Sequence, residues 1–193
     1  MENMNNNYSF ITNFNMVNGL TNDLNPVQRN LSKMKGMYYD EKAYQEMLKN
    51  GDPLVYEFYN SEVPEKDSDL IYGTSIVYPG KVGNEFFMTK GHFHTILETA
   101  ETYFCLNGHG YMMMESKDGK VEVQEMKKGA ALYVPPGYAH RSINVSQNET
   151  LVTFFVFRAD AGHEYGSIEE KGFRKLVIEE NKQIKIIDNP NWK

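Results

Sequence analysis

One stretch decides the fold of this chain: Gly129-Ala-Ala-Leu-Tyr-Val-Pro-Pro-Gly-Tyr-Ala-His-Arg-Ser-Ile-Asn144. Two short runs rich in apolar residues flank a Pro-Pro-Gly turn, which is typical of two β-strands joined by a tight loop. The fixed positions follow the pattern Gly-x5-Pro-x-Gly-x2-His-x3-Asn, with His140 as the histidine. We expect strands at Ala131–Val134 and Arg141–Asn144, with His140 directly before the second strand.

The same texture extends over the chain from Leu54 onward, where short β-branched and aromatic runs alternate with Gly, Pro, Asn and Asp turns. The further strands that we expect are Leu54–Tyr59, Leu70–Tyr78, Glu85–Thr89, Thr102–Leu106, Gly110–Glu115, Val121–Met126, Leu151–Phe157, Lys175–Glu179 and Ile184–Ile187. Strands at this spacing, with no Gly-rich phosphate loop, internal repeat or heptad pattern, indicate an all-β barrel or sandwich rather than βαβ units.

Composition excludes several classes of protein. The 193 residues fit one domain, and 40% apolar residues can build a sizeable core. A net charge of −6 gives no basic surface for nucleic acid or anionic lipid. The single cysteine, Cys105, excludes an intramolecular disulfide framework, and it is most simply a buried packing residue. With no long apolar run and no signal peptide at the N-terminus, we expect a cytoplasmic protein without membrane contacts.

The N-terminal region differs from the rest. Residues 1–25 contain nine Asn and few charges, which predicts a partly ordered arm, although its aromatic residues Tyr8, Phe10 and Phe14 could instead pack on a partner subunit. Short helices are expected from Pro26 to Lys35 and from the cap residue Asp40 to Gly51, so residues 26–50 add helices to one domain of residues 26–193.

Histidines provide the candidate chemistry. His92 and His94 are two residues apart, so on a strand both imidazoles point to the same face. With His140 and a carboxylate from Glu98 or Glu101, they form a ligand set suited to a divalent transition metal. Taken alone, the pair could also be two ordinary polar strand residues.

The stretch Gly129–Asn144 matches the second cupin motif without a mismatch, and His92-x-His94 resembles the first. That motif places a Gly seven residues after its Glu, which Glu101 and Gly108 satisfy and Glu98 does not. Glu98 fits the usual shorter gap from the histidines, and the opening Gly of the motif is displaced. We expect Glu101 as the ligand at the start of a strand, Glu98 in the loop before it, and a metal-binding cupin double-stranded β-helix, or jelly-roll barrel.

Nearly the whole chain, from about Phe14 onward, resembles one cupin family, the archaeal-type glucose-6-phosphate isomerases. Two segments are specific to that family beyond the metal motifs: Thr89-Lys90-Gly91-His92-Phe93-His94 and Ala159-Asp160-Ala161-Gly162-His163. Further matching segments are Asp52–Glu57, Tyr78–Gly83, Ala100-Glu101, Tyr133–Pro136, Tyr165-Gly166 and Asp188–Pro190.

The resemblance implies an isomerase that interconverts glucose 6-phosphate and fructose 6-phosphate. It implies metal ligation by His92, His94, Glu101 and His140, with Fe²⁺ or Mn²⁺ as the expected ion and Ni²⁺, Co²⁺ or Zn²⁺ as alternatives. It also implies phosphate binding by Thr89-Lys90-Gly91 with Ser75, further substrate contacts from Tyr56, Tyr103, Tyr133 and His163, and a homodimer. Glu101 is then the candidate catalytic base, with a metal-assisted hydride shift as the alternative mechanism.

Two positions depart from the family pattern, which has Thr at Ser75 and Tyr at Phe157; the second change removes a polar group near the pocket. Other interpretations stay open for single residues. The three tyrosines could be core residues, Lys90 an ordinary solvated charge, and His163 a structural residue. Two other functions also stay open: a cupin dioxygenase with redox-active iron or copper, and a sugar-binding cupin without turnover.

Overall fold

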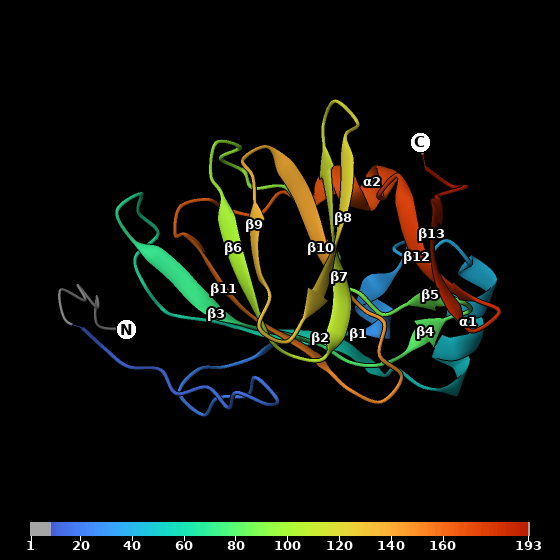
Figure 1. Ribbon diagram of the computed structural model, residues 1–193, viewed down its shortest axis with the longest axis horizontal. Helices are drawn as coiled ribbons and strands as arrows, with labels where there is room; N and C mark the ends of the chain where they lie inside the picture. Colours follow the sequence, from blue (N-terminus) through green and yellow to red (C-terminus); the bar gives the residue numbers. More distant parts are fainter. Residues whose placement is uncertain (1–8, 193) are drawn as a thin grey trace.

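The computed structural model describes residues 9–192 and contains three antiparallel sheets (Figure 1). The six-stranded sheet has the order β1 (Val27–Asn30), β2 (Leu54–Asn60), β3 (Leu70–Val77), β11 (Leu151–Arg158), β6 (Glu101–Asn107) and β9 (Ala131–Val134). The three-stranded sheet has the order β10 (Tyr138–Asn144), β7 (His109–Ser116) and β8 (Val121–Lys127). A smaller sheet contains β13 (Gln183–Asp188), β12 (Lys175–Glu180), β5 (Glu85–Phe86) and β4 (Lys81–Val82).

The first two sheets form the jelly-roll barrel of a cupin. Successive strands change sheet, as from β6 to β7 and from β9 to β10, so the two sheets enclose one core. That core is apolar and includes Cys105, Met112, Met113 and Val134. Along β9 the residues alternate between exposed and buried, as expected for a strand with one face toward a core. The predicted all-β cupin fold is confirmed.

The strand predicted at 85–89 is shorter, because β5 ends at Phe86 and only Met88 continues the pairing, through a bridge to Ile143. The second predicted helix is confirmed as α1 (Glu41–Asn50), where the Asp40 side chain accepts a hydrogen bond from the Ala43 N–H. The sequence did not predict β4 or the short helix α2 (Gly166–Lys171).

The first predicted helix is wrong. Residues Val27–Asn30 form β1, which pairs with β2, and only Leu31–Met34 form a short 3₁₀ helix. Pro26 precedes the first residue of an edge strand, a position that proline tolerates as well as it tolerates a first helical turn. Burial of Leu31 and Met34 then fixes the single turn against the core.

The described part of the arm, residues 9–25, packs on the six-stranded sheet (Figure 1). Phe14 contacts the rings of Tyr72 and Phe154, and the Thr74 hydroxyl donates a hydrogen bond of 2.6 Å to the Gly19 carbonyl. Tyr8 lies outside the described residues. No helix in residues 9–192 is long and apolar enough to cross a membrane.

Candidate active site

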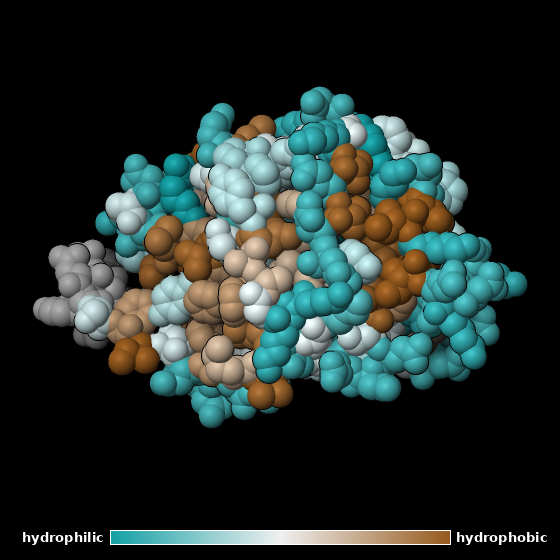
Figure 2. Space-filling model, viewed as in Figure 1, coloured by the Kyte–Doolittle hydropathy of each residue, from teal (hydrophilic) through white to brown (hydrophobic). Residues whose placement is uncertain are grey.

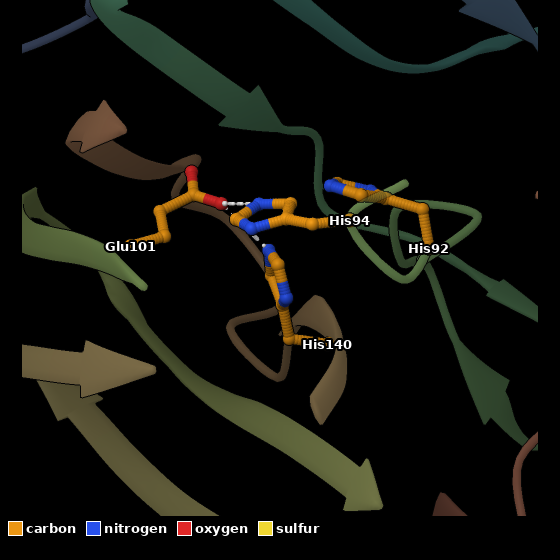
Figure 3. Close-up of side chains that lie close together, drawn as sticks. All are labelled: His92, His94, Glu101 and His140. Carbon is orange, nitrogen blue, oxygen red and sulfur yellow. Dashed lines mark hydrogen bonds and ion pairs between the residues drawn. The ribbon is translucent and has the colours of Figure 1, made fainter. Parts of the chain in front are cut away.

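Three segments bring the predicted metal ligands together inside the barrel (Figure 3). His92 and His94 lie on the segment after β5, which runs beside β10 through a bridge between His92 and His140. Glu101 is the first residue of β6, and Glu98 lies in the exposed turn before it, as the spacing predicts. The structure therefore supports the choice of Glu101 over Glu98.

One potential ligand atom from each of the four side chains lies within 4.8 Å of the others. Glu101 Oε2 lies 3.1 Å from His94 Nε2 and 2.8 Å from His140 Nε2. The Nε2 atom of His92 is buried and has no hydrogen-bond partner among the described residues. Three imidazoles and one carboxylate, with one buried imidazole nitrogen left without a partner, form a donor set that fits a divalent transition ion.

Hydrogen bonds on the far side of two rings fix their tautomers. The Thr99 hydroxyl donates to the Ile96 carbonyl, so at 2.7 Å it accepts from the Nδ1–H of His94. The Nδ1–H of His140 donates to the Tyr138 carbonyl at 3.4 Å. With Nδ1–H held by these acceptors, each ring in its neutral form can offer the Nε2 lone pair to a metal ion.

Burial and neighbouring side chains together set the pKa values of His92 and Glu101. Burial lowers the pKa of His92 well below its usual value, and the nearby His140 and His163 lower it further, so the ring is neutral. Burial alone would raise the pKa of Glu101, but His140, with His94 and His92, outweighs this effect and holds the pKa below its usual range. The cluster therefore combines an ionised Glu101 carboxylate with the neutral imidazole of His92, and both are forms that bind metal ions.

A pocket of about 530 Å³, including its open mouth, lies over the cluster. Its wall combines hydroxyl groups, aromatic rings and the backbone of Gly91, and it includes His92, Glu101 and His140. Burial raises the pKa of Tyr56 to about 12, and burial together with Glu101 raises the pKa of Tyr103 well above its usual value. Both phenols are therefore protonated and can donate hydrogen bonds to a polar ligand.

A family model for glucose-6-phosphate isomerase matches residues 28–193. The chain belongs to the glucose-6-phosphate isomerase family. It is 49% identical over 165 residues to the glucose-6-phosphate isomerase of Thermococcus litoralis, covering 86% of each chain. It is 48% identical to that of Pyrococcus furiosus, covering 86% of this chain and 87% of the relative. It is 38% identical to putative glucose-6-phosphate isomerase 1 of Rhizobium meliloti, covering 86% and 78%.

Among solved structures, the chain is similar to an oxalate oxidase at 13% identity, with a TM-score of 0.49 over 59% of this chain and 56% of that one. It is also similar to a Bacillus subtilis oxalate decarboxylase at 23% identity, with a TM-score of 0.44 over 56% and 27%.

Most of the residues that family resemblance assigns to the substrate line this one pocket. They are Tyr56, Ser75, Thr89, Gly91, Tyr103 and His163. They come from β2, β3, β6 and the segments after β5 and β11, so only the folded barrel brings them together. Phe157, where the family pattern has Tyr, also lines the pocket.

Two of the residues that the family resemblance assigns to the substrate do not line this pocket. The Lys90 side chain pairs with Glu169 at 2.6 Å and does not line the pocket. Tyr133 is 60% exposed and lies outside the pocket on β9, opposite the exposed Thr102 in the sheet register. Glu101 and Tyr103 alternate with Thr102, so Tyr133 lies on the outer face of the sheet.

Five lining residues were missing from the predicted site: Phe58, Asn60, Ser142, Phe155 and Tyr165. A period of two identifies most of them, since Phe58 and Asn60 follow Tyr56 on β2, and Ser142 follows His140 on β10. Tyr165 stacks on His163, with ring centroids 6.0 Å apart. The alternation of residues along strands already predicted would have revealed these neighbours.

Proposed function

We propose that this protein catalyses the metal-dependent interconversion of glucose 6-phosphate and fructose 6-phosphate. One observation carries the proposal: in a member of this family, a metal donor set and a segment of hydroxyl groups and glycine line the same pocket. The donor set suits the carbonyl end of an open-chain sugar, and the segment suits its phosphate.

Thr89 and Gly91, with Ser75, form the phosphate end of the proposed site. The Ser142 N–H donates a hydrogen bond of 3.1 Å to the Thr89 hydroxyl oxygen. That bond occupies an acceptor position of Thr89, so the hydroxyl proton is available to a phosphate oxygen. Ser75 retains the hydroxyl of the family's threonine, whereas the Lys90 side chain pairs with Glu169.

The protonated phenols of Tyr56 and Tyr103, together with His163, orient the sugar hydroxyl groups in the proposed complex. All three line the pocket, and His163 packs edge-on against His92 with ring centroids 4.3 Å apart. Phe157 adds an apolar surface beside His94 and His163, where tyrosine would offer a further hydroxyl.

We assign His92, His94, Glu101 and His140 as the ligands of one divalent ion per subunit. When bound, the ion supplies a Lewis acid that polarises the substrate carbonyl. Neutral imidazoles and one carboxylate accept several first-row ions; we propose Fe²⁺ or Mn²⁺, with Co²⁺, Ni²⁺ or Zn²⁺ as less effective replacements.

Glu101 is the proposed base that moves a proton between the first and second carbons of the open-chain sugar. Its carboxylate lies in the pocket wall within reach of a bound ligand, and its lowered pKa keeps it ionised, the form that can accept a proton. Labelled solvent tests this step. Incorporation of solvent hydrogen into the product supports proton transfer, whereas no incorporation supports a hydride shift.

We also propose that the protein is a cytoplasmic homodimer that serves glycolysis and gluconeogenesis. The arm carries exposed apolar side chains, such as Ile11 (84% exposed) and Val17, and Phe104 and Tyr133 are exposed on the sheet beside it. Figure 2 shows apolar residues reaching the surface in patches. Deleting residues 1–20 should shift the dimer to monomer in sedimentation at low concentration; a dimer that persists would exclude the arm from the interface.

A coupled assay from fructose 6-phosphate tests the proposed function. Protein stripped with a chelator should be inactive, and added Mn²⁺ or Fe²⁺ should restore turnover. A lack of metal-dependent turnover would overturn the isomerase proposal, and sugar-phosphate binding without turnover would instead support a binding protein. Oxygen uptake with an apolar substrate would indicate a dioxygenase.

A further inference from the structure

The segment Thr89–Gly91 contains an extra residue relative to the strand beside it. Met88 pairs with Ile143 and His92 pairs with His140, so three residues on one side face two on the other. This is the arrangement of a β-bulge, which interrupts the ladder and redirects the backbone. Gly91 has a φ of +78°, a conformation that favours glycine.

The bulge is packed tightly from behind. A Cβ at Gly91 would lie 2.7 Å from the Phe173 ring and 3.1 Å from the Arg141 Cβ. Within the described part of the chain, the Gly91 N–H has no backbone hydrogen-bond partner, although Gly91 lines the pocket. The bulge therefore offers backbone polar groups to a ligand on one side and rests on two side chains on the other.

Arg141 is one of these two side chains. His140 and Ser142 line the pocket, so Arg141 lies on the opposite face of β10, where it is only 3% exposed. One guanidinium nitrogen donates to the Lys90 carbonyl, and another lies 3.0 Å from the Met88 sulfur. The guanidinium also stacks 4.3 Å from the centroid of the Phe173 ring. These contacts fix its planar group directly behind the bulge.

The positive charge of Arg141 lacks a close counter-charge. Among the residues that the structure describes, no carboxylate lies within ion-pair distance of it, and the buried Glu85 is the acidic group that acts on it most strongly. Its Nε is buried without a hydrogen-bond partner. Burying a cation without a counter-ion costs desolvation free energy. A phosphate bound on the other side of the bulge would offset part of that cost.

We propose that Arg141 is a positioning residue for the substrate's phosphate: it holds the Lys90 carbonyl at the bulge and supplies compensating positive charge without touching the phosphate. The inference rests on the proposed isomerase function. It adds a buried cation to a phosphate site whose lysine, Lys90, is paired elsewhere.

The test compares metal-loaded wild-type protein with Arg141→Met, Arg141→Lys and the control Arg174→Met. Arg174 also stacks on an aromatic ring, that of Trp192, but it lies outside the pocket. Arg141→Met should raise the KM for fructose 6-phosphate by about 10- to 100-fold, the range for losing a unit charge close to the phosphate in a partly buried site, with a much smaller fall in kcat. Arg141→Lys should recover part of the loss, and Arg174→Met should keep the wild-type KM.

Two substrate analogues, tested as inhibitors, separate a role at the phosphate from a general structural role. Arabinonate 5-phosphate and arabinonate share the carboxylate and hydroxyl end, and only the first carries a phosphate. Arg141→Met should weaken inhibition by the first about 10-fold or more and leave inhibition by the second within about threefold. If Arg141→Met does not fold, the two compounds are compared on Arg141→Lys. We expect that variant also to weaken inhibition by the phosphorylated compound more than inhibition by the other.

Equal losses for both inhibitors, or an unchanged KM, would overturn the inference. Turnover by the wild-type protein is measured first, so that a failure of the isomerase proposal can be told apart from a failure of the proposed role of Arg141. Without metal-dependent turnover the isomerase function itself fails, whereas normal wild-type turnover with an unaltered Arg141→Met variant refutes only the role of Arg141.

Discussion

Position 101 carries a buried carboxylate, whereas position 98 carries one exposed in the turn before β6. Glu101→Gln keeps the shape of the side chain, but an amide cannot accept the substrate proton and binds a divalent ion weakly. Turnover should therefore fall by about 10²–10⁴-fold, even with excess metal. Glu98→Gln is the matched control and should stay within a few-fold of wild type in the same coupled assay. The reverse result would show that the shorter motif spacing identifies the ligand.

The hydrogen bond between Thr99 and His94 should contribute to the affinity for the metal ion. Its hydroxyl accepts the Nδ1–H of His94 at 2.7 Å, so Thr99→Val leaves this proton only the backbone carbonyl of residue 99, at 3.2 Å, and the ring less firmly oriented. We expect the affinity for Mn²⁺ to fall about 10- to 100-fold, measured by competition with a chelator. Thr102→Val changes an exposed residue on the same strand as Glu101, and it should bind Mn²⁺ like wild type. Equal affinities in the two variants would argue against this role for Thr99.

The sequence predicted the site residues well where local spacing along the chain determines which way a side chain points. His92 and His94 are two residues apart in an extended segment, so the period of a strand predicts that both point to the same face, and Glu101 begins a strand as its spacing to Gly108 predicts. Tyr133 lies on the outer face because Leu132 and Val134, its neighbours on β9, take the side that meets the core. The ion pair of Lys90 with Glu169, 79 residues away, forms only in the folded chain, so local sequence could not reveal it.

The N-terminal cap of α1 should contribute to the free energy of unfolding. The Asp40 carboxylate accepts a hydrogen bond of 2.9 Å from the Ala43 N–H at the start of the helix. Asp40→Ala should lower the free energy of unfolding by about 1 kcal/mol in urea titrations, because that N–H then lacks its partner. Asp40→Asn retains a capping oxygen and should lose much less. Equal losses in both variants would point to a contact other than the cap.

Elements with strong local signals were predictable, and elements created by tertiary pairing were not. α1 has its cap at Asp40 and a stop at Gly51, both visible in the sequence. β1 is short and exposed on its first two residues, and it exists because β2 offers it an edge. The bulge at Gly91 likewise depends on β10 as its neighbour. Local preference is a weak guide where pairing with a distant strand decides the conformation.

The titration of Glu85 should make the free energy of unfolding of the whole protein depend on pH. Glu85 is 1% exposed, and burial raises its pKa to about 7. One carboxylate oxygen accepts from the Tyr39 N–H, and the other is buried with no hydrogen bond from any described residue. Below about pH 4.5 both the folded and the unfolded chain hold this proton, so its contribution to stability is fully present.

As pH rises from about 4.5 to 7, the unfolded chain loses this proton first, so the free energy of unfolding should fall by up to about 3 kcal/mol. Glu85→Gln keeps an acceptor for the Tyr39 N–H but cannot ionise. In urea titrations across this range, its stability relative to wild type should therefore rise with pH. Glu170→Gln, on the exposed side of α2, should show no such trend. A constant difference between Glu85→Gln and wild type would mean that Glu85 titrates alike in both states.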